Sequence, residues 1–137
     1  MTTTRYLVDT NVLLRFLSGQ PAPQAAAAKK LFACAAEGEV VLEVSPVIVA
    51  EAFYTLHSFY GVERKTAADK LAILLQQHGV RLREASAVLS ALSLIQTVSI
   101  GFADAYLAAS ANEEKLSVAS FDRDFDKLKT PRFEPAE

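Results

Sequence analysis

The sequence is poor in the residues that build disulfides, zinc sites and membrane spans. Its 137 residues include one cysteine, two histidines and no tryptophan. The single cysteine, Cys34, cannot form a disulfide within the chain, and its alanine-rich surroundings predict a small buried side chain. No apolar run approaches the ~18 residues that a membrane span requires. These absences predict a cytoplasmic protein that has neither a disulfide framework nor a membrane anchor.

Length and charge are those of an ordinary globular chain. About half of the residues are apolar, and 14 basic and 16 acidic side chains give a net charge of −2. This length favours a single domain over residues 1–137. A slightly acidic balance argues mildly against a nucleic-acid-binding protein. If bound metal neutralised four of the acids, however, the net charge would rise from −2 to +2. The net charge therefore does not exclude a nucleic-acid-binding protein.

Short strand-like runs alternate with longer helical patterns. Ser45-Pro46 is typical of a helix start, and Gly61 and Gly79 are typical helix terminators. Alternating strands and helices indicate an α/β fold with a parallel sheet, in which ligands bind beyond the carboxyl ends of the strands. The patterns predict strands at 5–8, 40–44, 80–82 and 116–119, and helices at 10–17, 22–36, 46–60, 64–78, 84–97, 103–113 and 124–128.

Four acids interrupt or end apolar stretches on separate elements: Asp9, Glu51, Asp104 and Asp122. A carboxylate drawn toward an apolar core is unfavourable unless it is paired or binds a cation. Oxygen ligands without clustered His or Cys suit Mg²⁺ or Mn²⁺ better than zinc. The set therefore predicts a divalent-metal site at which the four carboxylates converge.

Each acid also has a plainer interpretation. Asp9 is suited to cap the helix that follows it, and Asp104 to interact with the dipole of a helix start. Asp122 lies in a segment that could be a simple turn. Glu51 is the hardest to explain structurally, because no basic residue shares its helical face. The ordered set of four carries more weight than any one member.

The ordered segments resemble the PIN-domain family, and especially its VapC-like toxin branch. The resemblance spans nearly the whole chain, although each segment alone is weak. One departure is Gly101, where many relatives carry another acid, so a fifth acidic ligand is in doubt. The segments that carry the resemblance are Val8–Arg15, Val49–Glu51, Phe102–Ala109 and Ser120–Phe125.

The resemblance implies a Rossmann-like α/β/α sandwich with a short central parallel sheet. It also implies a metal-dependent endoribonuclease that uses a metal-activated water, with Mg²⁺ or Mn²⁺ as cofactor. Its catalytic and metal-binding acids would be Asp9, Glu51, Asp104 and Asp122. The accessory residues would be Asn11 beside the first acid and Ser120 beside the last, with Asp124 as a further acid or a solvated turn residue.

Partners follow from the same resemblance. VapC-like proteins pair with a small antitoxin protein and form homodimers, so both are expected here beside the RNA substrate. RNA contacts are expected from Arg15, Arg123 and Lys127, with Lys129 and Arg132 nearby, unless these side chains form only a solvated basic face.

Three other functions remain open from the sequence. A PIN-like nuclease could act in RNA processing outside toxin–antitoxin biology, and a PIN-like domain could serve as a non-catalytic binding module. An aspartyl-nucleophile phosphatase would place its nucleophile at Asp9. That class generally carries a second Asp two residues later, where this chain has Asn11.

Overall fold

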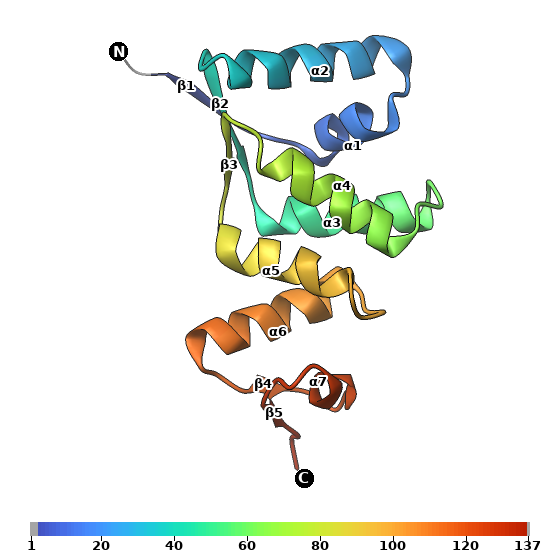
Figure 1. Ribbon diagram of the computed structural model, residues 1–137, viewed down its shortest axis with the longest axis vertical. Coiled ribbons are helices and arrows are strands. Elements are labelled where there is room, and N and C mark those ends of the chain that lie inside the picture. The colour runs from blue at the N-terminus through green and yellow to red at the C-terminus, as the bar shows by residue number, and fades with distance from the viewer. Residues whose placement is uncertain (1–2, 137) are drawn as a thin grey trace.

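The computed structural model of the chain describes residues 3–136 (Figure 1). It confirms the predicted helices and strands to within a few residues and adds one short strand, β5, that the sequence did not predict. The strands are β1 (Thr4–Leu7), β2 (Val40–Val44), β3 (Val80–Leu82), β4 (Val118–Ala119) and β5 (Arg132–Phe133). The helices are α1 (Thr10–Ser18), α2 (Ala22–Ala36), α3 (Pro46–Ser58), α4 (Arg64–Leu75), α5 (Ala85–Ile95), α6 (Phe102–Glu114) and α7 (Asp124–Lys127).

Local signals account for several of these boundaries. Ser45 is the N-cap residue of α3 and Pro46 its first helical residue, where a missing N–H costs nothing. Helix α1 ends at Gly19, which takes a left-handed conformation and donates its N–H to the carbonyl of Arg15. No helix within residues 3–136 is long and apolar enough to span a bilayer.

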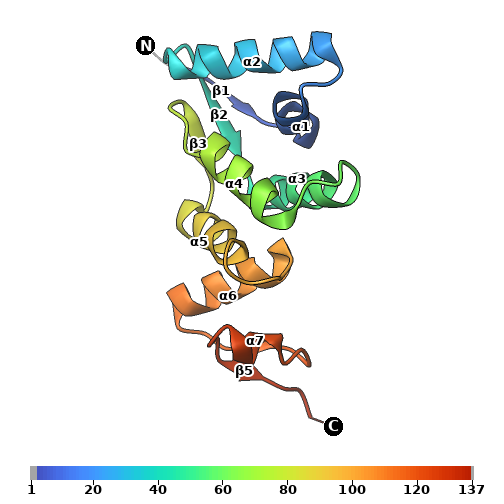
Figure 2. The ribbon, with the colours of Figure 1, turned by 45° about the vertical axis from the view of Figure 1, so that its right-hand side comes forward.

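The central sheet has three parallel strands in the order β1-β2-β3. The register pairs Tyr6 with Leu42, and Leu42 with Val80, so these side chains share one face of the sheet. That face meets the helices: Leu42 and Val44 are fully buried. Figure 1 and Figure 2 show α1, α3 and α4 stacked beside the sheet. The α/β class with a short central parallel sheet, expected from the sequence, is confirmed.

The opposite face of the sheet carries an ion-pair cluster. Glu43 on β2 is buried and accepts a hydrogen bond from Arg5 Nε at 2.7 Å, and Arg83 lies 3.6 Å from its other oxygen. Burial alone would raise the pKa of Glu43. The Arg5 hydrogen bond and the charges of Arg5, Arg83 and Arg81 outweigh burial and lower it.

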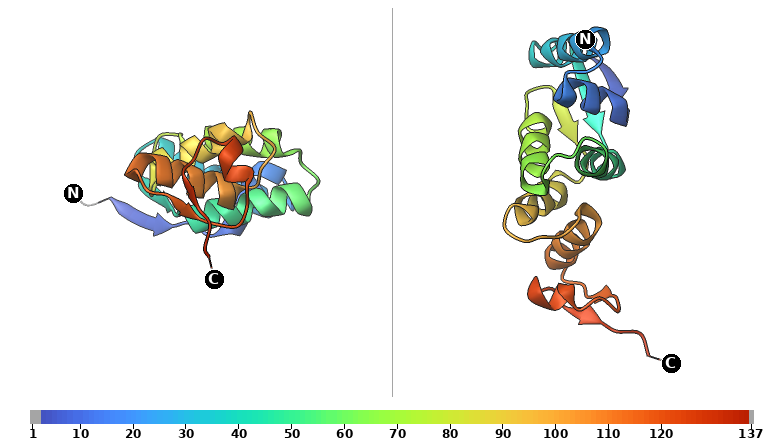
Figure 3. Two further views of the ribbon diagram at one scale, coloured as in Figure 1. Left: turned by 90° about the horizontal axis from the view of Figure 1, so that it is seen from below. Right: turned by 90° about the vertical axis from the view of Figure 1, so that its right-hand side faces the viewer.

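The C-terminal elements lie apart from this sheet. Strands β4 and β5 pair with each other as a separate parallel two-stranded sheet. Helix α6 packs along α5, and α7, β4 and β5 follow at the end of the molecule away from α2 (Figure 1). The molecule is therefore elongated, and β1 and β4 lie at different levels of its long axis (Figure 1; Figures 2 and 3 show the same shape from other sides).

The turn from α4 into β3 depends on a glycine. Gly79 has φ +88°, and an added Cβ would lie 2.2 Å from the backbone oxygen of Ala35 at the end of α2. We expect Gly79→Ala to destabilise the protein by about 2–4 kcal/mol, because both the left-handed backbone and the close approach oppose a side chain. Chemical denaturation measures this loss.

The matched control is Gly61→Ala. Gly61 has φ +69° but no atom within 4 Å of the added Cβ, so only backbone strain of about 1 kcal/mol is expected. Equal losses in the two variants would contradict the predicted close contact with α2.

Candidate active site

Asp9 follows β1 and precedes α1. Its backbone is extended, at φ −80° and ψ 152°, as an N-cap residue requires, but its side chain makes no capping hydrogen bond. Its carboxylate is exposed to solvent. The Asp9 carboxylate is therefore not used to cap α1, which was the plainer role considered for it.

Glu51 lies on the exposed side of α3. Val47 one turn before it and Tyr54 one turn after it are 72% and 71% exposed. A largely apolar groove of about 610 Å³ runs from the start of α3 to the start of α6, and its lining includes Ala50 and Ala103. These two residues immediately precede Glu51 and Asp104, so the segments that carry the two acids border one groove.

Asp104 lies in the first turn of α6 and is half-buried. Burial raises the pKa of its carboxyl group, and the negative charges of Asp122 and Asp124 raise it further. Asp104 therefore lies close enough to Asp122 and to the possible accessory acid Asp124 to be affected by their charges. Repulsion of this kind is what a bound cation would relieve.

The loop after β4 is ordered by its own side chains. Asp122 donates its backbone N–H to Ser120 Oγ at 2.9 Å, and Asp122 Oδ1 accepts the backbone N–H of Asp124 at 2.8 Å. Ser120 thus contacts the backbone of the last acid, and its accessory role stays a prediction. Asp122 also acts as a turn residue, the plainer role considered for it, because its carboxylate accepts a hydrogen bond within the loop.

The structure does not gather all four acids at one point. Across residues 3–136, no three His, Cys, Asp or Glu side chains form a group that could hold one metal ion. Asp9 follows β1 of the three-stranded sheet, whereas Asp122 follows β4 of the separate C-terminal sheet. Convergence of Asp9, Glu51, Asp104 and Asp122 on a metal stays a prediction.

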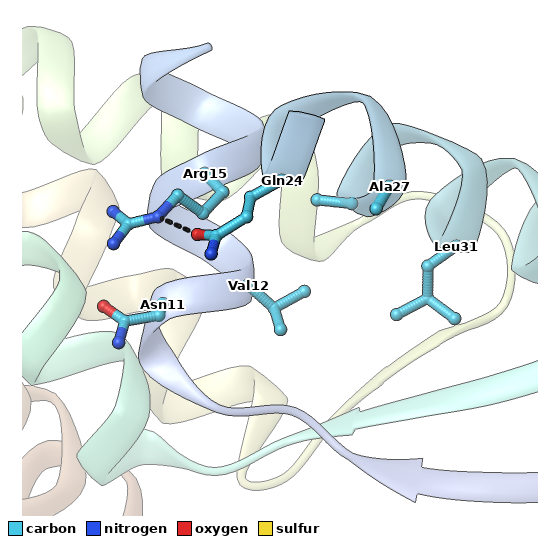
Figure 4. Close-up of a pocket in the computed structure, with 7 residues that line it drawn as sticks. Asn11, Val12, Arg15, Gln24, Ala27 and Leu31 are labelled. Carbon is cyan, nitrogen blue, oxygen red and sulfur yellow. Dashed lines mark hydrogen bonds between the residues drawn. The ribbon is translucent and has the colours of Figure 1, made fainter. Parts of the chain in front are cut away.

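The predicted RNA-contacting residues differ in whether other side chains of the protein already bind them. Arg15 donates from Nε to Oε1 of Gln24 at 2.8 Å (Figure 4). Its Nη1 also donates to the hydroxyl of Tyr60 at 3.4 Å. Asn11 lies one turn earlier on the same side of α1, and both line a cavity of about 280 Å³ (Figure 4). Arg15 therefore helps to join α1 to α2 and to the loop that follows α3.

The C-terminal basic residues lie around the Asp122 loop. Lys127 Nζ is 3.6 Å from Asp124 in an exposed pair, and Arg123 is the exposed N-cap residue of α7. Arg132 pairs with Asp126 and donates to the backbone oxygen of Ser120. Arg123 and Lys127 thus lie beside the acidic loop, whereas Arg132 mainly stabilises it.

The sequence interpretation missed one acid with apolar neighbours. Glu43 lies within Val40–Val44, a stretch as apolar as those around the four predicted ligands. Of its partners, Arg5 lies on β1 and Arg83 directly follows β3, and these are the two strands that flank β2. Alternation along β1 and β2 could have revealed that Arg5 and Glu43 share a sheet face.

The donor chemistry fits a hard divalent cation. Asp104, Asp122 and Asp124 offer only carboxylate oxygens, which such a cation prefers. Burial, and then the charges of Asp122 and Asp124, raise the pKa of Asp104. Asp104 and Asp122 would hold the cation, and the part of Asp9 and Glu51 in the site stays a prediction.

Comparisons with known proteins place this geometry in context. The family model described as PIN domain matches residues 6–131, nearly the whole chain. No curated protein matches the sequence. Among solved structures, the chain is similar to one titled as VapBC2 from Rickettsia felis bound to a DNA fragment from their promoter. The two share 16% identity and a TM-score of 0.40, over 95% of this chain and 98% of that chain.

The raised pKa of Asp104 predicts a pH-dependent effect on stability. The folded state binds this proton more tightly than the unfolded state, so stability is lost as the pH rises from below the unfolded pKa through the folded one. In EDTA at neutral pH, we expect Asp104→Asn to raise the thermal unfolding midpoint slightly, and this gain to vanish near pH 3. Thermal scans across pH measure it.

Asp69→Asn is the matched control, because Asp69 is an exposed acid on α4. Its substitution should leave the unfolding midpoint nearly unchanged at both pH values. A lower midpoint for Asp104→Asn at neutral pH would refute the predicted repulsion.

Proposed function

Because the chain belongs to the PIN-domain family, whose members are typically nucleases, we propose that it is a divalent-metal-dependent endoribonuclease. We further propose that it is the toxin of a toxin–antitoxin pair. Its substrate is then RNA, its cofactor Mg²⁺ or Mn²⁺, and its protein partners an antitoxin and a second copy of the chain.

One observation carries the catalytic proposal. Within the matched span, Asp104 is half-buried, and its pKa is raised first by that burial and then by the charges of Asp122 and Asp124. Clusters of acids that raise the pKa of a neighbouring carboxylate cost folding stability at neutral pH. Such clusters are typical of metal-dependent catalysis.

The chemistry explains why acids would serve a reaction on an anionic substrate. Carboxylates alone repel a phosphodiester, which carries negative charge and gains more during cleavage. A bound divalent cation supplies the opposite charge, activates water and stabilises the leaving oxygen. The protein's own part is to hold the ligand oxygens: Ser120 and the backbone of Asp124 fix the Asp122 loop, and the first turn of α6 presents Asp104.

RNA binding is best supported around the Asp122 loop. Arg123 and Lys127 are exposed beside it, and their positive charge would attract the phosphate backbone. Arg15 is a weaker candidate, because Gln24 and Tyr60 already engage its guanidinium. We assign Arg15 to positioning α1, and the contact with RNA mainly to Arg123 and Lys127.

The toxin role rests on the resemblance of the four motif segments to the VapC-like branch and on the single-domain length. A PIN nuclease of RNA processing is the second candidate, and a non-catalytic binding module the third. A short reading frame for a DNA-binding antitoxin beside the gene supports the toxin. Its absence, with intact nuclease activity, favours RNA processing.

Cleavage of RNA tests the enzyme directly. With Mg²⁺ or Mn²⁺, the purified chain should cut total bacterial RNA into discrete fragments, and EDTA should abolish the cuts. Asp104→Asn should reduce the rate of RNA cleavage at least about 100-fold, because it replaces a carboxylate oxygen of a predicted metal ligand and removes the negative charge. Asp69→Asn should retain full activity. Metal-independent cutting, or equal rates in the two variants, would refute the proposal.

The ends of the products report the mechanism. Hydrolysis by water leaves a 5′-phosphate and a 3′-hydroxyl and does not use the 2′-hydroxyl of the RNA. We expect the fragments to be degraded by a 5′-phosphate-dependent exonuclease and a substrate with 2′-deoxyribose at the cut to be cleaved. A 2′,3′-cyclic phosphate end would contradict this mechanism.

A further inference from the structure

Helix α3 carries a ridge of three side chains that begins at a predicted catalytic acid. Glu51, Tyr54 and His57 follow one another at intervals of three residues, and side chains spaced in this way form a continuous ridge along a helix. Tyr54 is 71% exposed and His57 is partly exposed. The ridge extends roughly 9 Å along the helix axis. A ligand that passes Glu51 along this ridge therefore meets an open aromatic ring next.

The far end of the ridge opens into a polar cavity of about 360 Å³. Besides His57, its lining includes Arg64 and Lys65 at the start of α4, and Thr97 and Ser99 in the loop between α5 and α6. Arg64 Nη1 donates to Ser99 Oγ at 3.4 Å. This basic cavity therefore lies where the start of α4 meets the α5–α6 loop.

The walls of the basic cavity are held by hydrogen bonds within the protein. His57 Nδ1 lies 3.0 Å from the carbonyl oxygen of Val62, and because a carbonyl only accepts, Nδ1 is the donor. Val62 in turn donates its N–H to the carbonyl of Leu56 at 2.9 Å. In the opposite wall, Thr97 Oγ1 donates to the carbonyl of Leu94 at 3.1 Å. These bonds form the cavity without a ligand.

The charges in the basic cavity favour an anion. Within residues 3–136, neither Arg64 nor Lys65 forms an ion pair with a carboxylate. Glu63 belongs to the same lining, so the cavity carries two positive charges and one negative charge. Guanidinium and ammonium groups without a carboxylate partner are suited to bind phosphate. The start of α4 therefore offers two cations to a phosphate group.

The basic cavity lies close to Asp104. Ser99 in its lining precedes Asp104 by five residues, so at most about 18 Å separates their Cα atoms. Phe53 of α3 also packs against Phe102 at the start of α6, with ring centroids 6.4 Å apart. Figure 1 shows the α3–α4 turn and the α5–α6 loop on the same side of the molecule. A short stretch of a linear ligand can therefore extend from the acids to the cavity.

We propose that the ridge and the basic cavity bind single-stranded RNA on one side of the scissile bond. An unpaired base stacks on the ring of Tyr54, and the phosphate beyond it binds Arg64 and Lys65. Aromatic stacking accepts every base and phosphate contacts carry no sequence information, so this subsite positions the strand without reading it. It adds to the contacts proposed for Arg123 and Lys127. Its use in cleavage rests on the proposed nuclease function, whereas RNA binding is measurable without cleavage.

Substitution of Tyr54 tests the stacking contact. The binding of a fluorescent single-stranded RNA is followed by anisotropy in EDTA, so that metal-dependent cleavage does not interfere. Tyr54→Leu should weaken binding at least about fivefold, because it removes the ring on which the base stacks. Tyr54→Phe is the matched control, because it keeps the ring and should keep the affinity. Equal affinities in Tyr54→Leu and the wild type would refute the stacking contact.

Charge substitutions test the basic cavity. Arg64→Gln and Lys65→Gln should each weaken RNA binding about three- to tenfold at low salt and lower the salt dependence by about one released counterion. Glu63→Gln should instead tighten binding, because it removes the opposing charge from the same lining. Lys29→Gln, at an exposed position on α2, controls for the change in net charge. Thermal unfolding midpoints establish that each variant is folded.

The remaining outcomes separate this subsite from its alternatives. Equal losses in Arg64→Gln and Lys29→Gln would overturn the cavity in favour of diffuse attraction. A labelled polyglutamate peptide of the same charge that binds as tightly as the RNA, and depends on Arg64, would overturn it in favour of an acidic protein segment. RNA binding that depends on Tyr54 and Arg64, without cleavage in Mg²⁺ or Mn²⁺, would refute only the nuclease. Cleavage with unchanged RNA affinity in every variant would refute only the subsite.

Discussion

The packing of α5 against α6 is the contact on which the C-terminal third of the molecule depends. Leu92 and Ile95 of α5 meet Phe102 and Ala105 of α6 in the main core. The next turns of α6 are rich in alanine, and Ala108 contributes to a second cluster under β4. One helix thus serves two cores, and its position fixes where Asp104, β4 and the Asp122 loop lie.

Local structure could be read from the sequence because its causes are local. The helix start at Ser45-Pro46 and the parallel α/β arrangement both follow from residue type and spacing. Strand β5 was missed because two residues, Arg132 and Phe133, are too few to show alternation. The division into two sheets could not be predicted either, since strand pairing depends on contacts between distant segments and leaves no local pattern.

The candidate site shows what apolar flanks can and cannot indicate. A carboxylate among apolar residues is unfavourable, and Asp104 fits this description because it is half-buried and has a raised pKa. Apolar neighbours do not separate metal ligands from ion-pair residues, since Glu43 has equally apolar neighbours and is satisfied by Arg5 and Arg83. Only the position of a partner on adjacent strands distinguishes the two cases.

The spread of the elements along the long axis also bears on how the chain opens. Because α6 joins the main core to the small cluster of Ala108, Ala111, Val118 and Phe125, loss of the small cluster would leave the three-stranded sheet and its helices packed. The amide hydrogens of β4 and β5 would therefore exchange with solvent faster than those of β2.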